Sequence, residues 1–166
     1  MASEEQFSIE MEHLEGYEFR VRYDLEGVDD LRVDEPPPLG GGRGPNPSRL
    51  IATAAANCLG ASLLYCVTRR QPPPGGLKAT ATCTMTRDPK GRLRIGGIAV
   101  RLEVGGELEQ AVRLRRCLAL FEAFCVASAS LREGFPVQVA VVNAAGEVLH
   151  QGPAPEADPP PTRERP

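Results

Sequence analysis

The order of the predicted elements indicates an α+β fold. Three strands precede a long helix, two further strands and a second helix follow it, and one more strand comes last. The strands are grouped rather than alternating singly with helices, which excludes a doubly wound parallel sheet. With 166 residues the chain can bury the core of one domain. We expect a single domain over residues 1–150 and a disordered, proline-rich tail over residues 151–166.

The N-terminal segment predicts a small antiparallel sheet. Residues 7–14 alternate apolar and polar side chains, and residues 17–23 do so again after a turn at Gly16. Strict alternation indicates strands that bury one face. A short third strand is expected around Leu31 and Val33. On the second strand we expect the buried side chains to be Tyr17, Phe19, Val21 and Tyr23.

The stretch DEPPPLGGGRGPNPSRLIATAAANCLGASLL, residues 34–64, predicts a loop followed by a long helix. Prolines remove backbone donors and glycines add conformational freedom, so the first half suits neither a helix nor a central strand. Asn46 is a good N-cap, and Pro47 suits the first helical position. The helix should continue to about Arg69, with a buried stripe formed by Leu50, Ala54, Cys58, Ala61, Leu64 and Tyr65.

The second half of the chain predicts a hairpin, a helix and a final strand. Residues 77–87 and 92–104 should form two strands, joined by the turn sequence DPKG. A second helix is expected over residues 107–132, because leucines, phenylalanines and Cys125 recur there at helical spacing. Residues 135–143, FPVQVAVVN, indicate the last strand.

Charge and composition argue against several function classes. The net charge of −3 offers no basic face for nucleic acid. The acidic N-terminus is neither a signal peptide nor a transit peptide, so we expect a cytoplasmic protein with reduced thiols. The alanine-rich helix suits a bilayer span poorly, so no membrane partner is expected. The two histidines lie far from each other and from every cysteine, so we expect no metal site and no cofactor.

The five cysteines carry the most informative chemistry. Cys58 and Cys66 are eight residues apart in the first helix, as are Cys117 and Cys125 in the second. Eight residues rise about 12 Å along a helix, so neither pair can form a disulfide within its own helix. If the helices pack antiparallel, matching Cys58 to Cys125 also brings Cys66 toward Cys117. A buried, inert side chain is the commoner role for Cys66, Cys83 and Cys117.

Two neighbouring thiols could reduce a peroxide. A thiolate of low pKa attacks the O–O bond and becomes a sulfenic acid, a second thiol condenses with it, and an outside dithiol reduces the disulfide. Cys58 lies three turns into its helix, beyond the reach of the helix dipole, so a guanidinium must stabilise the thiolate. The RLRR sequence at residues 113–116 is more typical of a solvated helix face. The candidates for this guanidinium are Arg20, Arg22, Arg43 and Arg49, and the sequence does not choose among them.

Two sequence motifs resemble the OsmC/Ohr family, which comprises osmotically inducible protein C and the organic hydroperoxide resistance proteins. The first is the Gly-Pro-Asn-Pro entry at residues 44–47, the alanine-rich helix, and Cys58 eleven residues after the second proline. The second is the Cys-x-x-Ser sequence at residues 125–128, followed by a strand. The resemblance covers roughly residues 7–148.

The resemblance implies both an architecture and an activity. It implies an OsmC-like fold, in which antiparallel sheets pack around two central helices of an intertwined homodimer. It also implies a thiol-dependent peroxidase that reduces organic hydroperoxides, or less often hydrogen peroxide. Cys58 matches the peroxidatic cysteine of the family and Cys125 the resolving one. The implied reductant is an external dithiol of the lipoyl type.

Two departures from the family pattern keep an alternative open. Ser48 stands where peroxidase members usually carry a glutamate that holds the catalytic arginine, and Val126 stands where proline is common. Neither Arg20 nor Arg22 on the first hairpin matches the family's arginine convincingly. The alternative is a non-enzymatic OsmC-like dimer that binds a small apolar ligand or senses oxidation.

Overall fold

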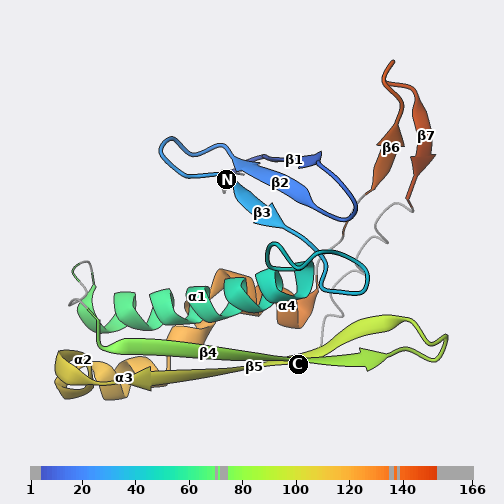
Figure 1. The fold of residues 1–166 in the computed structure, drawn as a ribbon. Helices are drawn as coiled ribbons and strands as arrows, with labels where there is room; N and C mark the ends of the chain where they lie inside the picture. Colours follow the sequence, from blue (N-terminus) through green and yellow to red (C-terminus); the bar gives the residue numbers. More distant parts are fainter. Residues whose placement is uncertain (1–4, 70, 72–74, 135–136, 138, 153–166) are drawn as a thin grey trace, which may run out of the picture. The chain divides into compact units, whose positions relative to one another are not determined.

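The computed structural model describes residues 5–69, 71, 75–134, 137 and 139–152. The chain divides into two compact units, Met1–Ser128 and Ala129–Pro166. The elements confirm the α+β class and pair into antiparallel sheets, as Figure 1 shows. The expectation of one domain over residues 1–150 stays a prediction.

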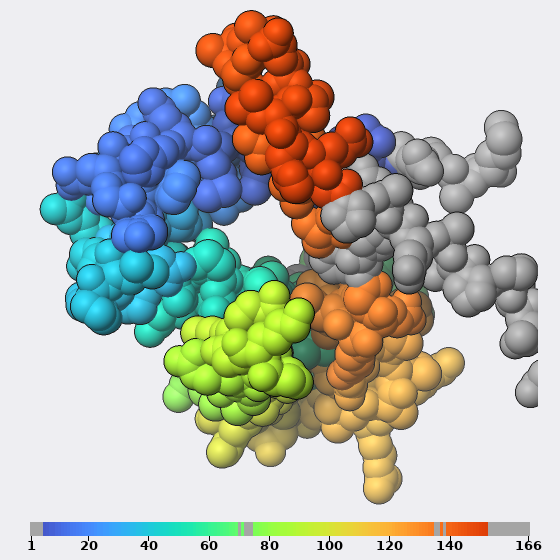
Figure 2. Space-filling model, turned by 90° about the vertical axis from the view of Figure 1, so that its right-hand side faces the viewer, coloured from blue at the N-terminus to red at the C-terminus, as the bar shows by residue number. Residues whose placement is uncertain are grey.

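The predicted N-terminal sheet is present, with the strand order β1 (Ile9–His13), β2 (Phe19–Tyr23) and β3 (Leu31–Val33). All three strands pair antiparallel. The expected burial of one whole face is wrong. Val21 and Val33 are buried, but several large apolar side chains of residues 7–23 are exposed. Figure 2 shows this N-terminal segment, in blue, at the molecular surface. These side chains are exposed because no layer among the described residues covers them; they are Phe7, Ile9, Met11, Tyr17 and Tyr23.

Buried carboxylates anchor the glycine-rich loop that leads to the long helix. Asp34 accepts backbone N–H bonds from Arg43, at 3.1 Å, and Gly41, at 2.9 Å. These hydrogen bonds lower the pKa of Asp34, and the bond from Arg43 contributes most. Desolvation of the buried carboxylate acts in the opposite direction but is the smaller effect. Glu18 accepts from Arg32 at 2.6 Å and from the Arg43 side chain at 3.1 Å. The loop is therefore fixed against β2 and β3 before the helix begins.

Helix α1 (Pro47–Thr68) begins and ends close to its predicted limits. The Asn46 side chain caps it by accepting from the Arg49 N–H at 3.2 Å. The helix packs on the hairpin of β4 (Leu77–Arg87) and β5 (Leu93–Val104) (Figure 1). Among the described residues it alone is long and apolar enough to cross a membrane, a property that the core helix of a soluble protein shares.

The expected buried stripe of α1 is wrong. The side chains that pack inward are Ala52, Ala55, Ala56, Leu59, Leu63 and Val67. Ala54, Ala61 and Tyr65 are exposed, and Cys58 is half-buried. The helix is apolar nearly all round, so periodicity could not determine which face packs on the hairpin.

The second predicted helix is also wrong as a continuous element. The segment forms α2 (Gly106–Gln110), α3 (Leu114–Leu118), the 3-10 turn η1 (Phe121–Phe124) and α4 (Val126–Glu133). The backbone is extended at Ala111 and Cys125, with ψ of 126° and 99°. β-branched and aromatic residues at these points are weak helix formers, which lowers the cost of the breaks. Cys117 and Cys125 are both buried as a result.

The main hydrophobic cluster lies between the C-terminal half of α1 and this segment. Its buried members are Leu63 and Val67 of α1, Leu108 of α2 and Cys117 of α3. Side chains of the β4–β5 hairpin, including Leu77 and Leu102, pack against the cluster. The core thus holds α1 next to the elements that carry the later cysteines.

The C-terminal unit contains the hairpin of β6 (Ala140–Val142) and β7 (Val148–Gln151). Strand β6 confirms part of the expected last strand; residues 135, 136 and 138 of that expectation lie outside the described residues, as do residues 153–166 of the expected tail. Strand β7 was not predicted. The feature of the sequence that indicates this hairpin is Asn143, a residue type that favours turns. Its side chain accepts hydrogen bonds from the N–H groups of Ala145 and Glu147.

Gly44→Ala should destabilise the protein by about 1–3 kcal/mol. A Cβ atom at Gly44 would overlap the Arg32 carbonyl oxygen, so the loop could not stay against β3. Urea unfolding measures the free energy. The matched control is Gly97→Ala in β5, where a Cβ atom meets nothing within 4 Å. An equal loss in both variants would contradict this account.

Candidate functional site

Cys58 lies at the wall of a cavity of about 1180 Å³. The half-buried Cys58 side chain lies in the middle of α1 and lines this cavity. Much of the remaining lining is apolar and comes from α1 and from the segment around α3 and η1. These apolar residues are Ala61, Tyr65, Leu120 and Phe124.

The structure brings Cys125 to Cys58. The Cys58 thiol interacts directly with the side chain of Cys125 and with the backbone N–H groups of Val126 and Ala127. Cys125 is 0% exposed, whereas Cys58 lines the open cavity. The pair therefore combines one thiol that a small molecule can reach with one that it cannot.

The two thiols differ in acidity, and the expectation of a low pKa at Cys58 is wrong. Burial raises the pKa of Cys58, and the neighbouring Cys125 raises it further. Burial also opposes ionisation of Cys125, but hydrogen bonds from Cys58 and Ser128 outweigh it and lower the pKa of Cys125. The Ser128 N–H lies 3.4 Å from the Cys125 Sγ atom.

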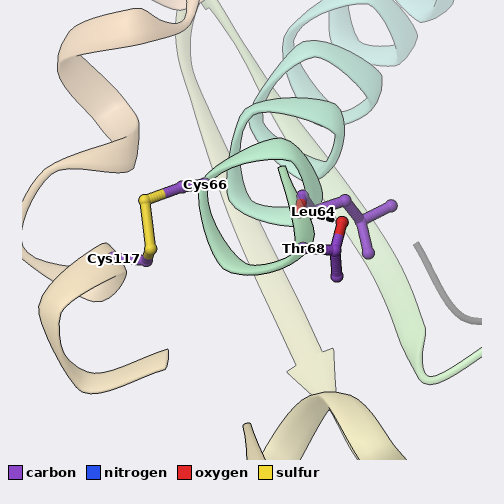
Figure 3. The surroundings of a disulfide bond; sticks show 4 residues. All are labelled: Leu64, Cys66, Thr68 and Cys117. Atoms are coloured by element: carbon purple, nitrogen blue, oxygen red, sulfur yellow. Dashed lines mark hydrogen bonds between the residues drawn. A yellow bond between two sulfur atoms is a disulfide. The ribbon is translucent and has the colours of Figure 1, made fainter. Parts of the chain in front are cut away.

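The second cysteine pair forms a disulfide. Cys66 and Cys117 are bonded, with 5.7 Å between their Cα atoms, and Figure 3 shows the bond joining the last turns of α1 to α3. In the same turns the Thr68 hydroxyl donates to the Leu64 carbonyl at 2.8 Å (Figure 3). Both pairings expected from the equal eight-residue spacing are present. The expectation of reduced, inert thiols is wrong for Cys66 and Cys117, because the antiparallel register brings their Cα atoms within disulfide reach.

The four arginines proposed as activators are engaged elsewhere. Arg20 and Arg22 pair with Glu12 and Asp30, and Arg43 pairs with Glu15 and Glu18. Arg49 donates to the Asn46 side chain. These contacts direct the four guanidinium groups toward their own loops and strands.

Different arginines line the Cys58 cavity, namely Arg69, Arg113 and Arg116. None of them has an acidic partner within the described part of the chain. Arg113 and Arg116 are exposed, which confirms the expectation of a solvated helix face for RLRR. The broken helix places them at the cavity, and no sequence signal indicated that break.

No metal site is visible in the residues that the structure describes, since no three His, Cys, Asp or Glu side chains cluster there. The thiols of Cys58 and Cys125 are the reactive groups that the described residues bring together at this cavity. A half-buried thiol beside a buried thiol of lower pKa can undergo two-electron oxidation followed by disulfide formation.

A family model described as OsmC-like protein matches residues 40–140, more than half of the chain. The chain belongs to the OsmC-like family. No curated protein sequence matches this OsmC-like chain.

Solved structures of similar fold carry related names. One is an OsmC-like protein from Mycoplasma pneumoniae, with 15% identity over 78% of this chain and 89% of that chain, and a TM-score of 0.60. Another is a putative organic hydroperoxide resistance protein from Vibrio cholerae, with 23% identity over 90% and 97% of the two chains, and a TM-score of 0.58. A third is the organic hydroperoxide resistance protein OsmC from Legionella pneumophila. It has 18% identity over 79% of this chain and 92% of that chain, and a TM-score of 0.54. At these identities the likeness shows the fold.

Cys66→Ser should destabilise this OsmC-like protein by about 4 kcal/mol. The Cys66–Cys117 disulfide closes a chain segment of 51 residues and thereby lowers the conformational entropy of the unfolded state. Urea unfolding without reductant measures the loss, and adding a dithiol to the wild type should reproduce it. Cys83→Ser is the control, since Cys83 is a free thiol. A wild type whose stability does not respond to reductant would contradict a stabilising bond.

Proposed function

We propose that this protein is a thiol-dependent peroxidase that reduces organic hydroperoxides, or hydrogen peroxide, through Cys58 and Cys125. One observation carries the proposal: the two thiols meet, and only Cys58 opens to the cavity. Membership of the OsmC-like family supports it, as do the names of the similar Vibrio cholerae and Legionella pneumophila proteins, which describe organic hydroperoxide resistance.

The reaction follows from the exposure of the two sulfurs. Cys58 attacks the terminal oxygen of the hydroperoxide, the O–O bond breaks, and the alkoxide leaves as an alcohol after taking a proton. Cys58 is then a sulfenic acid. Cys125 attacks its sulfur, a disulfide forms, and water leaves. An external dithiol, of the lipoyl type, reduces that disulfide by exchange, which returns both thiols.

The cavity favours an organic hydroperoxide over hydrogen peroxide. Tyr65, Leu120 and Phe124 offer apolar surface next to Cys58, where a substrate's hydrocarbon part would leave water. The guanidinium groups on the same wall can stabilise the alkoxide that forms when the O–O bond breaks. We place this reaction in the cytoplasm, with no nucleic acid or membrane as partner.

We also propose that the working form is a homodimer. A single chain exposes many large apolar side chains, among them Phe7 at 81%, Tyr65 at 66% and Phe124 at 70%. Exposed apolar surface on this scale is typical of an interface, and most soluble oligomers are symmetric homodimers. Light scattering should give twice the 17.8 kDa mass of the chain at micromolar concentration. A mass of one chain would overturn the dimer.

A second candidate function has its own support. The raised pKa of Cys58 and the Ser48 departure favour a non-enzymatic OsmC-like dimer that binds a small apolar ligand or senses oxidation. The two functions differ in turnover. A peroxidase consumes many equivalents of peroxide per chain when a dithiol is supplied, whereas a sensor stops after one.

Cys58→Ser should abolish peroxide consumption, because serine cannot form the sulfenic acid. The measurement is loss of cumene hydroperoxide in the presence of dihydrolipoamide. Cys125→Ser should still oxidise once at Cys58, and dimedone labelling with peptide mass spectrometry detects the product. Cys83→Ser is the matched control and should keep the wild-type rate. Unchanged turnover in Cys58→Ser would overturn the assignment.

A further inference from the structure

The Cys66–Cys117 disulfide lies at the wall of the same cavity as Cys58. Both of its half-cystines line that cavity, and the bond joins the last turns of α1 to α3 (Figure 3). Cys58 lies eight residues earlier on α1, about 12 Å away along the helix axis. A small molecule that enters the cavity therefore also meets a disulfide, to which the peroxide reaction gives no role.

The two sulfurs of this disulfide differ in exposure. Cys66 is half-buried, whereas Cys117 is 1% exposed and belongs to the main hydrophobic cluster. Thiol–disulfide exchange begins when a thiolate attacks one sulfur and displaces the other. An incoming thiolate can reach Cys66, so Cys117 is the sulfur that leaves. Its departure as a thiolate among apolar side chains is unfavourable unless a cation lies nearby.

Three arginines bring positive charge to this end of the cavity. Arg69 follows Cys66 by three residues, at the C-cap of α1. Arg113 lies one helical turn before Cys117, whose N–H donates to the Arg113 carbonyl at 3.0 Å, and Arg116 immediately precedes Cys117. All three arginines line the cavity, and none has an acidic partner in the described part of the chain. Guanidinium groups in a cleft attract anions and stabilise a neighbouring thiolate.

The rest of the lining indicates what kind of thiol would enter. Tyr65, Leu120 and Phe124 give the cavity exposed apolar surface in addition to the arginines. Apolar surface suits a hydrocarbon chain, and guanidinium groups suit a carboxylate. The molecule that fits both is an anionic thiol whose charge and sulfur are joined by a short apolar chain.

We propose that the Cys66–Cys117 disulfide is a second redox site of this protein, at which an anionic thiol or dithiol attacks Cys66 and displaces Cys117. The inference goes beyond the peroxidase function and does not depend on it. Disulfides that a thiol can reach are typically the labile ones. The arginines attract the reductant to this site and stabilise the Cys117 thiolate as it leaves.

Each step of this exchange balances without a further reactant. The thiolate of the reductant attacks the Cys66 Sγ atom, the Cys66–Cys117 bond breaks, and Cys117 leaves as a thiolate that takes a proton from solvent. The second thiolate of a dithiol then attacks the reductant sulfur of this mixed disulfide and displaces Cys66. The reductant leaves as a cyclic disulfide, oxidised by two electrons, and the protein holds two free thiols.

The test compares two reductants on one full-length protein, the double variant Cys58→Ser, Cys83→Ser. Dihydrolipoate and dihydrolipoamide carry the same dithiol, and only the first has a carboxylate. Alkylation of Cys66 by iodoacetamide, followed by peptide mass spectrometry, measures the rate at which the disulfide opens. Dihydrolipoate should act about tenfold faster at low ionic strength, because the arginines raise its concentration in the cavity, and salt should reduce this ratio.

Two sets of arginine variants assign the preference to the cavity. Replacing Arg69, Arg113 and Arg116 by glutamine should bring the ratio of the two rates close to one. Arg115→Gln is the matched control and should keep the ratio, because Arg115 is exposed on the same helix but is not part of the cavity lining. Equal rates for the two reductants before any arginine is changed would overturn the site, as would a disulfide that opens only in urea.

A monothiol shows which sulfur is attacked. With 2-mercaptoethanesulfonate, which is anionic and has no second thiol, the mixed disulfide should form on Cys66 and the alkylated thiol should be Cys117. The opposite distribution would overturn the assignment of Cys66. Because these variants lack Cys58, the result can be interpreted whether or not the wild type consumes peroxide, and failure of one proposal is distinguishable from failure of the other.

Discussion

The antiparallel pairing of α1 with the segment after β5 is the constraint on which the rest of the site depends. Two contacts at different levels along α1 fix this pairing. They are the Cys66–Cys117 disulfide and the contact between Cys58 and Cys125. Leu63, Val67 and Leu108 fill the space around the disulfide. Because both levels share one eight-residue spacing, a shift of register would break the covalent link and the thiol contact together. The disulfide thus holds the reactive pair in place without taking part in it.

The same pairing leaves the Cys58 thiol open to the cavity and places hydrogen-bond donors around the Cys125 sulfur. A small molecule in the cavity meets Cys58, while α4 directs its first N–H groups at Cys125. Ser48 follows the Asn46–Pro47 entry and carries no carboxylate that could pair with an arginine. Arg43 is held by Glu15 and Glu18 instead. The cations that line the cavity are Arg69, Arg113 and Arg116. Hydrogen bonds lower the pKa of the Cys125 thiol.

Local patterns predicted the elements that local forces determine. Alternation located β1 and β2, and the Asn46–Pro47 cap located the start of α1. The equal cysteine spacing indicated, on the condition that the two helical segments pack antiparallel, which sulfurs would meet, and the pairing holds although the second segment is broken between Cys117 and Cys125. The patterns failed where several faces were equally apolar. The alanine-rich α1 buried a different stripe, and the segment after Gly105 broke into α2, α3, η1 and α4.

The sequence by itself determined the α+β class and the resemblance to the family, and it made the two cysteine pairs conditional on antiparallel packing. Only the tertiary structure decided that Cys66 and Cys117 are bonded, that burial raises the pKa of Cys58, and that Arg113 and Arg116 line the cavity. The physical reason is that burial and hydrogen bonding set the acidity of a thiol. Both depend on contacts between residues far apart in the chain, which spacing along one helix does not record.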